Sequence, residues 1–331
     1  ARRLLDDLAV KLSRVDDSFV ARNAQVQLAK GVAYYLQGRV DEALPLLISF
    51  SNRQPNHVGT RMLLARIAHS RNQDARVVDL LGPIEGTLGE SPELLAPYMR
   101  ALIKQNKAEK ALTLGEALYE ADPDNEDVAH LLASTYAYLR QPEKAIRVLT
   151  RDKESTFTLK SGLMLGYLLL GQNQLPEALA TAMKLQSAYP SDATVANFAG
   201  AVLLRSGDLE NADRALAQAM RLDADSLPTR LNYAYLLLKR GDSEGAAARF
   251  RDLAEQFPME SQAAQALSDM ESQDGDLQSA IKWTEKLVAL EPENYAHSYC
   301  LAMLYLRAGR AEQTLEYVAR LEREFSLEEQ L

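Results

Sequence analysis

The sequence predicts an all-α protein, an α-solenoid built from antiparallel helix pairs of about 34 residues each. Small residues recur at one position from Gly31 to Ala302, with Met99 as the exception, in steps of 34 residues except for one step of 33. A Gly/Asn series from Gly38 to Gly309 follows the same steps. Only 7% of the residues are aromatic, so small and aliphatic side chains, which suit the packing of helix on helix, carry the apolar content. A constant period of this length is the signature of stacked repeats, in which each unit packs on its neighbours.

Each recurring series has a physical cause within one helix pair. Gly and Asn tolerate the left-handed backbone conformation in which helices often end, so their series marks the end of each first helix. Its members are Gly38, Asn72, Asn106, Arg140, Asn173, Gly207, Gly241, Gly275 and Gly309. A second small-residue series lies in the second helices, where it lets two helices approach closely: Ala9, Ala43, Val77, Ala111, Ala145, Ala178, Ala212, Ala246, Ala280 and Thr314. Prolines at 55, 123, 190, 258 and 292 follow the second helices, because proline cannot continue the hydrogen-bond ladder.

This frame divides the chain into a half repeat and nine units. The units begin near Ala24, Val58, Pro92, Glu126, Leu159, Ala193, Leu227, Ser261 and Tyr295. Residues 1–23 form the half repeat, with a helix over 4–17, and we expect either a fragment of a longer array or an unusual cap there. Units one to four cover 24–157, and units five to nine cover 158–331. Unit four is one residue short and ends in a polar run, so residues 151–157 are the expected hinge or superhelix irregularity.

Two other units depart from the pattern. Unit two ends in a stretch rich in glycine, from Gly82 to Gly89, which predicts a shortened second helix followed by a looser loop. Unit eight places Ser268 and Glu271 where small and large apolar residues recur in the other units. We therefore expect the core of unit eight to be weaker than that of its neighbours.

The composition of the 331 residues argues against several classes of function. A net charge of −9 makes nucleic acids and anionic membranes poor default partners. No run of about 20 apolar residues is long enough to span a membrane. One cysteine cannot form an internal disulfide, and the four histidines show no metal-binding spacing. The sequence also lacks a glycine-rich phosphate loop and a nucleophile elbow, so we expect no enzyme, no cofactor and no metal site.

The spacing resembles that of the tetratricopeptide repeat (TPR) family, which has a small residue, a large residue three positions on, Gly or Asn at the turn, then Ala and Pro. Unit one shows this pattern as Gly31, Tyr34, Gly38, Ala43 and Pro55. Unit five shows it as Gly166, Leu169, Asn173, Ala178 and Pro190, and unit nine as Ala302, Tyr305 and Gly309. The resemblance covers nearly the whole chain. It implies a right-handed superhelix whose first helices line a concave groove that binds protein segments.

The inner positions of the first helices give the candidate groove residues, since positions spaced by three and four residues share one helix face. They are Tyr35, Arg66, His69, Arg100, Lys104, His130, Tyr138, Tyr167, Asn197, Arg205, Tyr235, Lys239, Tyr299 and Arg307, and Asn232 is added from a neighbouring position of its helix. Acidic residues are rare at these positions, so cations and tyrosines are expected to suit a segment with acidic and apolar side chains. An amide such as Asn232 offers a donor and an acceptor to a bound peptide backbone.

Two groups of cations stand out among these residues. Arg66, Arg100 and Lys104 cluster across units two and three, and we interpret this cluster as a binding feature. Arg205, Lys239 and Arg307 recur at one position near the ends of their helices. For this second group a ligand-binding role and a simple offset of the helix dipole are equally good explanations.

A narrower resemblance concerns cellular location. The stretches 55–57, 61–65, 79–83, 229–232 and 280–283 resemble bacterial TPR lipoproteins of exopolysaccharide-linked protein-sorting (PEP-CTERM) systems. This resemblance implies a periplasmic or envelope-associated protein. The first functional hypothesis is therefore a non-catalytic scaffold that assembles an envelope, secretion or protein-sorting complex. The alternatives are an adaptor that binds acidic polysaccharide during export and a cytoplasmic TPR adaptor.

Overall fold

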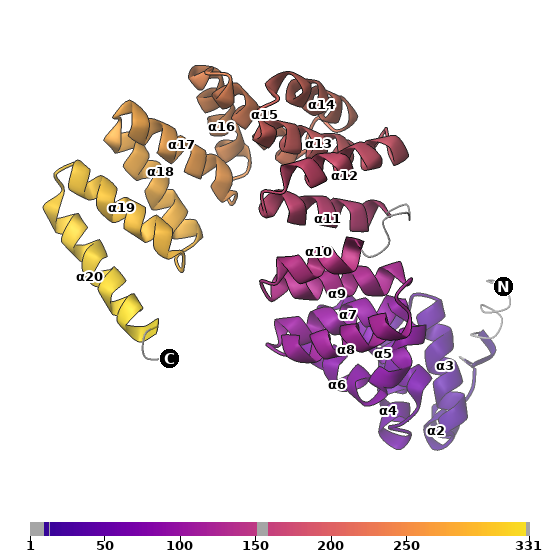
Figure 1. Cartoon of the computed structure of the whole chain (residues 1–331). Helices are drawn as coiled ribbons and strands as arrows, with labels where there is room; N and C mark the ends of the chain where they lie inside the picture. Colours follow the sequence, from indigo (N-terminus) through magenta and orange to yellow (C-terminus); the bar gives the residue numbers. More distant parts are fainter. Residues whose placement is uncertain (1–9, 13, 151–157, 329–331) are drawn as a thin grey trace. The chain divides into compact units, whose positions relative to one another are not determined.

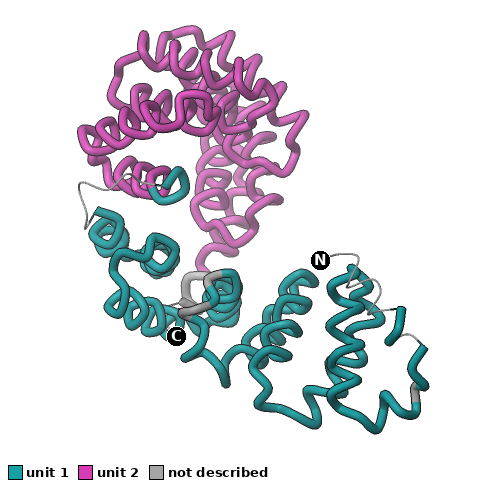
Figure 2. The backbone as a smooth tube through the Cα atoms, turned by 90° about the vertical axis from the view of Figure 1, so that its right-hand side faces the viewer, with its two compact units in different colours: residues 1–161 teal, residues 162–331 magenta. Residues whose placement is uncertain are grey.

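The protein is helical in the part of the chain that the computed structural model describes, which comprises residues 10–12, 14–150 and 158–328 (Figure 1). No β-strand occurs in these ranges. The chain divides into two compact units, which are distinct from the repeat units one to nine. Unit 1 comprises residues 1–161 and unit 2 comprises residues 162–331 (Figure 2). Half of the predicted N-terminal helix, residues 4–9 and 13, lies outside the described residues. Residues 10–12 are helical, but residues 14–16 are not and a separate helix begins at Asp17, so the prediction that one helix continues to residue 17 is wrong. The predicted hinge at 151–157 lies wholly outside the described residues and stays a prediction.

The described part of unit 1 contains helical residues 10–12, then a short helix, four helix pairs and one 3₁₀ segment. The short helix α2 spans Asp17–Arg22. The pairs are α3 (Ala24–Leu36) with α4 (Val40–Arg53), α5 (Val58–Ser70) with α6 (Asp74–Leu81), α7 (Pro92–Lys104) with α8 (Ala108–Ala121), and α9 (Glu126–Tyr138) with α10 (Pro142–Thr150). The 3₁₀ helix η1 (Gly82–Glu90) follows α6.

Unit 2 is a continuous run of helix pairs, apart from the first residues of α11, which belong to unit 1. The pairs are α11 (Leu159–Gly171) with α12 (Leu175–Ala188), α13 (Ala193–Ser206) with α14 (Leu209–Leu222), α15 (Leu227–Lys239) with α16 (Ser243–Gln256), α17 (Ser261–Asp274) with α18 (Leu277–Leu290), and α19 (Tyr295–Arg307) with α20 (Ala311–Glu328). Within the unit, each pair packs on the next, as α13 and α14 pack against α15. The predicted all-α solenoid architecture is confirmed.

The first helices begin and end where the repeat pattern predicts. All nine begin at the predicted unit starts, from Ala24 to Tyr295. Every member of the Gly/Asn series has a positive φ, from 55° at Asn72 to 86° at Gly275. Arg140 also adopts this conformation, with φ of 58°, although its side chain gives it no special tolerance of it. The repeat frame therefore determines the backbone conformation at this position, and residue type alone does not.

The small residues of the pattern allow close contact between helices. From Ala43 to Ala280, every member of the second-helix series has no exposed surface. In the first helices, a Cβ atom added at Gly166 would lie 2.2 Å from Cζ of Phe198. One added at Gly200 would lie 2.6 Å from Cδ2 of Leu216. Both distances are far below an ordinary carbon–carbon contact of about 3.5–4.0 Å, so the two glycines mark places where the backbone itself forms the packing surface.

Unit two of the repeat frame differs in part from its prediction. The second helix α6 is short, as expected, with eight residues instead of the fourteen of α4. The expected looser loop is wrong, because these residues form the 3₁₀ helix η1. Ile84 and Leu88 are buried in the core that η1 shares with α6 and α7. Burial of these two apolar side chains orders a segment rich in glycine and proline.

Unit eight fills its two exceptional positions with polar contacts. Ser268 is buried, and its Oγ lies 2.6 Å from Oγ1 of Thr284 in the partner helix α18. Glu271 accepts a hydrogen bond of 2.8 Å from Nη2 of Arg251, which lies in the preceding second helix, 20 residues earlier. In two other repeats a tyrosine occupies the position equivalent to Glu271, and it also forms a hydrogen bond with a residue of the preceding second helix. Tyr305 donates to Oε1 of Glu285 over 2.7 Å, and Tyr136 donates to Glu116, again 20 residues earlier.

Candidate functional site

Several predicted groove residues of unit 2 surround one hollow of about 670 Å³. It lies along the first helices α11, α13 and α15 and the turns that follow α11 and α13. Its lining residues are Leu170, Asn173, Ala201, Leu204, Arg205, Gly207, Leu209, Asn232, Tyr235 and Lys239. Four of these, Arg205, Asn232, Tyr235 and Lys239, belong to the predicted set. The structure therefore brings together residues from two successive repeats that are 34 or fewer positions apart in the sequence.

The cations of the hollow are exposed and face no acidic side chain. Arg205 and Lys239 occupy equivalent positions in the last turns of α13 and α15. Among the described residues, neither cation takes part in an ion pair, and none of the lining residues is acidic. The local charge of the hollow is therefore positive in a chain whose net charge is −9. Such a surface attracts carboxylates by charge-assisted hydrogen bonds.

The amide of Asn232 lines the hollow beside the cations and is held by a second amide, Asn197, that does not line it. Nδ2 of Asn232 donates a hydrogen bond of 2.8 Å to Oδ1 of Asn197, which is buried. This bond fixes the orientation of the Asn232 amide. One N–H and the side-chain carbonyl of Asn232 are not used in this bond, and Asn232 lines the hollow.

Aromatic side chains support the same first helices. Tyr235 packs edge-on against Phe250 with a centroid distance of 5.0 Å, and Tyr167 packs against Phe198 at 4.9 Å. Burial raises the pKa of both tyrosine hydroxyls, so they remain protonated donors at neutral pH. Tyr235 lines the hollow, whereas Tyr167, which is 43% exposed, lies outside it.

Arg307, the third cation of the recurring position, has a structural contact instead. Its Nη1 donates to Oγ of Ser272 over 2.6 Å, and its Nη2 donates to the carbonyl oxygen of Ser272 over 3.1 Å. These bonds join α19 to α17. Tyr299 on α19 stacks with Tyr295 at a centroid distance of 6.3 Å and lies on a separate apolar groove.

The predicted cation cluster of Arg66, Arg100 and Lys104 is largely neutralised by neighbouring acids. Arg66 forms an ion pair with Glu93 in the first turn of α7. Nζ of Lys104 lies 2.9 Å from Oδ2 of Asp74 in the first turn of α6. The count of acids at the inner positions left these two carboxylates out, because the first turns of adjacent helices supply them. Arg100 is exposed, and no ion pair involving it occurs among the described residues.

The remaining predicted residues of unit 1 are dispersed. His69 and Tyr138 are exposed, and Tyr35 is half-buried against the core of α3, α4 and α5. His130 is half-buried, and its Nδ1 is buried with no hydrogen-bond partner among the described residues. Burial, together with the positive charge of Lys160, lowers the pKa of His130 to about 4. His130 is therefore neutral at physiological pH and packs as part of the helix interface.

Comparison with protein families identifies the repeat. Two family profiles described as "Tetratricopeptide repeat" match residues 163–226 and 203–270, and a third of the same description matches residues 24–47. A profile described as "Anaphase-promoting complex, cyclosome, subunit 3" matches residues 104–185. The chain belongs to the tetratricopeptide repeat superfamily. No curated protein sequence matches this TPR chain.

Two solved structures share the TPR fold. The crystal structure of a tetratricopeptide repeat protein from Parabacteroides merdae aligns with 71% of this chain and 93% of its own, at 15% identity and a TM-score of 0.57. The crystal structure of the APC/C hetero-tetramer Cut9-Hcn1 aligns with 92% of this chain, at 16% identity and a TM-score of 0.55. The aligned region makes up 58% of that second chain. At these identities the likeness shows the fold.

Sequence reasoning missed one polar residue of the TPR hollow. Asn173 was assigned only to the turn after α11, where its φ is 57°, yet its side chain belongs to the lining. Its place in the connection between α11 and α12 could have indicated this, because Arg205 and Lys239 lie close to the equivalent connections of the next two pairs.

Across the described residues, no group of three or more His, Cys, Asp or Glu side chains is placed to hold a metal ion. No helix in the same residues has the length and apolarity needed to cross a bilayer.

Proposed function

We propose that this TPR protein is a non-catalytic interaction scaffold whose unit 2 hollow binds a partner segment with acidic and apolar side chains. The observation that carries the proposal is the pair of cations, Arg205 and Lys239, exposed beside a hollow with no acidic lining residue. Membership of the TPR superfamily supports the general role, since TPR arrays present extended binding surfaces.

Each part of the hollow has a distinct part in this binding. A carboxylate of the partner contacts Arg205 or Lys239 and replaces the water around these cations. The amide of Asn232, oriented by Asn197, binds one peptide group of the partner backbone through its remaining N–H and its carbonyl oxygen. Leu170, Leu204 and Tyr235 line the apolar part and accept an apolar side chain of the partner.

The test begins with a random peptide display library selected on the immobilised full chain. We expect the selected peptides to be enriched in Asp and Glu next to apolar residues. Their affinity should fall as salt rises from about 50 mM to about 300 mM, because the charges are exposed to solvent. Selected peptides without acidic enrichment, or with affinities insensitive to salt, would contradict the proposal.

A matched pair of double variants locates the binding site. Arg205→Glu with Lys239→Glu reverses both cations of the hollow and should weaken the selected peptides by at least about tenfold. Arg221→Glu with Lys282→Glu makes the same change of charge on exposed positions of the second helices α14 and α18. This control should leave the affinity within about twofold. Equal weakening by both double variants would show a general effect of net charge and refute the assignment.

We further propose, from the sequence resemblance to exopolysaccharide-linked TPR lipoproteins, that the scaffold assembles a secretion or protein-sorting complex in a bacterial envelope. Fractionation of the native cells with an antibody against the chain tests the location. Recovery in the periplasmic or envelope fraction supports this role, whereas recovery in the cytoplasm favours a cytoplasmic TPR adaptor.

A second candidate ligand is acidic polysaccharide, since a sugar carboxylate can contact the same cations while Tyr235 packs against the ring. One aromatic side chain in the lining makes this a weaker fit than a peptide. Titration with alginate distinguishes the two ligands. Salt-sensitive binding that is lost in the Arg205→Glu/Lys239→Glu variant supports the polysaccharide, and absence of binding eliminates it.

A further inference from the structure

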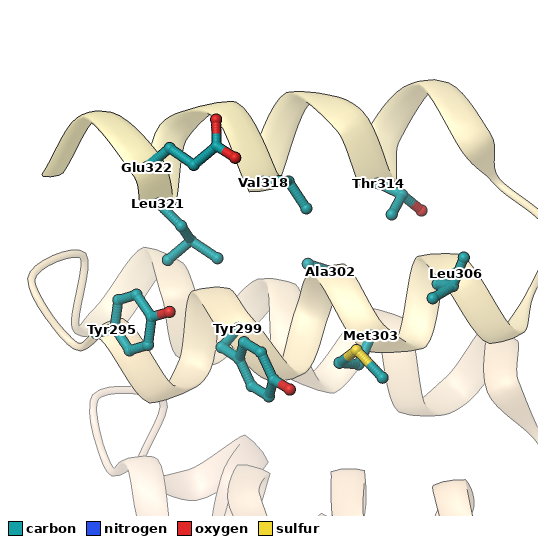
Figure 3. Close-up of a pocket in the computed structure, with 9 residues that line it drawn as sticks. All are labelled: Tyr295, Tyr299, Ala302, Met303, Leu306, Thr314, Val318, Leu321 and Glu322. Atoms are coloured by element: carbon teal, nitrogen blue, oxygen red, sulfur yellow. The ribbon is translucent and has the colours of Figure 1, made fainter. Parts of the chain in front are cut away.

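A smaller hollow of unit 2 lies between the first helices α17 and α19 and has a volume of about 180 Å³. Pockets for small molecules typically measure about 300–1,000 Å³, so this α17/α19 hollow has room for one side chain of a partner and little more. Two of its lining residues, Tyr299 and Met303, point away from α20 in Figure 3. The lining also includes Gln265, Asp269 and Ser272 of α17 and Arg307 of α19.

Asp269 is the acidic residue of this lining, and its carboxylate is only partly used. Oδ1 of Asp269 accepts a hydrogen bond of 2.9 Å from Nε2 of Gln265. Within the described part of the chain, Oδ2 of Asp269 accepts no hydrogen bond, and the residue, which is exposed, takes part in no ion pair. A carboxylate in this state can bind a basic side chain by charge-assisted hydrogen bonds.

The cation of the same lining is engaged elsewhere. Both terminal nitrogens of the Arg307 guanidinium donate to Ser272, which lies nearly one turn beyond Asp269 on α17. Arg307 forms no ion pair with Asp269. The α17/α19 hollow therefore has a negative end at Asp269, and the positive charge of Arg307 does not neutralise it.

Tyrosines come from the first helices on either side of Asp269. Tyr235, 34 positions earlier, has the equivalent position on α15 and lines the cationic hollow. Burial, together with the negative charges of Asp269 and Glu260, raises the pKa of Tyr235, so the field of these carboxylates reaches its hydroxyl. On the other side, Tyr299 lines the α17/α19 hollow with Asp269. A carboxylate close to tyrosine rings suits a Lys or Arg side chain, because the face of such a ring also attracts a cation within about 6 Å.

We propose that the α17/α19 hollow binds a lysine or arginine side chain of the same partner segment whose acidic side chain contacts Arg205 or Lys239. This inference rests on the proposed function, because one side chain in so small a hollow binds weakly by itself. The partner segment is therefore bipolar, and the order of charges along α13, α15 and α17 orients it. Neighbouring helices lie about 10 Å apart and an extended chain rises about 3.3 Å per residue, so its acidic and basic residues are about three or four positions apart.

The first experiment repeats the selection from a random peptide display library on the full-length wild type and two variants. Asp269→Asn removes the charge and keeps the shape of the side chain. Asp274→Asn is the matched control, since this exposed residue of α17 lines neither hollow. With the wild type and the control, we expect Lys or Arg to be enriched about three or four positions from the acidic residue. With Asp269→Asn the basic enrichment should disappear and the acidic enrichment should remain.

A charge exchange tests the contact directly. One peptide from the wild-type selection, and the same peptide with Glu in place of its basic residue, are titrated against the wild type and Asp269→Lys. The basic peptide should bind Asp269→Lys at least about fivefold more weakly than it binds the wild type. The Glu peptide should show the opposite preference. Circular dichroism spectra confirm that the variants keep their helix content.

Three outcomes would overturn the basic subsite. They are a wild-type selection without basic enrichment, equal basic enrichment with Asp269→Asn and Asp274→Asn, and a Glu peptide that binds Asp269→Lys no better than the basic peptide does. The Arg205→Glu/Lys239→Glu chain separates this failure from that of the proposed function. Peptides that lose affinity for that chain but are insensitive to Asp269 leave the cationic hollow in place and remove only the basic subsite. Selected peptides without acidic enrichment refute the proposed function itself, and this inference with it.

Discussion

Replacing Gly166 with alanine should destabilise unit 2, although alanine favours helices more than glycine does. The added Cβ would lie 2.2, 2.6 and 3.0 Å from Cζ, Cε1 and Cε2 of Phe198. An ordinary carbon contact needs about 3.5 Å, so the ring or the helix must move by about 1 Å. Phe198 has no exposed surface, and its ring cannot swing into solvent.

The magnitude follows from two opposing contributions. Overpacking of a core of this kind costs typically about 1–3 kcal/mol, and the overlap with a buried ring puts this substitution near the upper value. Alanine recovers about 1 kcal/mol of helix propensity. We therefore expect Gly166→Ala to lower the free energy of unfolding by about 2 kcal/mol. Gly171→Ala is the matched control on the same helix, because no atom lies within 4 Å of its added Cβ. It should leave stability unchanged or raise it by up to about 1 kcal/mol.

Urea denaturation followed by circular dichroism gives the overall effect, and hydrogen exchange of α11 and α13 shows where it acts. Exchange should accelerate in these two helices for Gly166→Ala. Phe198→Leu shortens the obstructing ring, so the double variant should lose less stability than the two single variants together. Equal stabilisation by Gly166→Ala and Gly171→Ala would refute the close contact, and so would strict additivity with Phe198→Leu.

Three further predictions follow from particular residues. Arg140→Asn introduces the residue found at three equivalent turns, and it should raise the stability of unit 1 by about 0.5 kcal/mol in urea denaturation; an unchanged or lower value would contradict the cost of the left-handed conformation. His130 should titrate near pH 4 by NMR. As the pH falls, the unfolded chain takes up this proton near pH 6.5 and the folded protein only near pH 4. The contribution of neutral His130 to the free energy of unfolding is therefore present above about pH 6.5 and is lost as the pH falls towards 4. His130→Phe should remove that part of the pH dependence, and a titration midpoint near 6.5 would disprove the burial effect. Thr284→Val should cost about 1 kcal/mol and show a non-additive double-mutant cycle with Ser268→Ala, whereas full additivity would mean that the two hydroxyls do not interact.

The fold was largely predictable because the residues that the helix-pair geometry requires recur at fixed positions in the sequence. A left-handed residue after each first helix favours Gly or Asn, so these residues recur where the backbone needs them. Arg140 was placed correctly by register alone. The segment from Gly82 to Glu90 was less predictable, because its glycines and proline favour a loop while Ile84 and Leu88 favour burial, and burial prevails.

The candidate site was only partly predictable, since a ligand surface depends on contacts between different repeats. The inner-face rule found Arg205, Tyr235 and Lys239, and Asn232 was added from a neighbouring position for its amide. It could not show that Glu93 and Asp74 neutralise Arg66 and Lys104, because those acids lie in the first turns of adjacent helices and were not counted on the same face. It also could not distinguish Lys239 from Arg307, whose bonds to Ser272 depend on the neighbouring side chain.

The polar links that reach back 20 residues have a consequence for how the array can change in evolution. Tyr136, Glu271 and Tyr305 each contact a residue of the preceding second helix at the same sequence distance. Duplication or loss of a whole 34-residue block keeps that distance at every junction, so the new interface is satisfied as soon as it forms. An insertion between the two partners of a link would change their separation along the chain and place donor and acceptor out of register. The chain can therefore lengthen or shorten its binding surface in whole repeats while its interior remains unchanged.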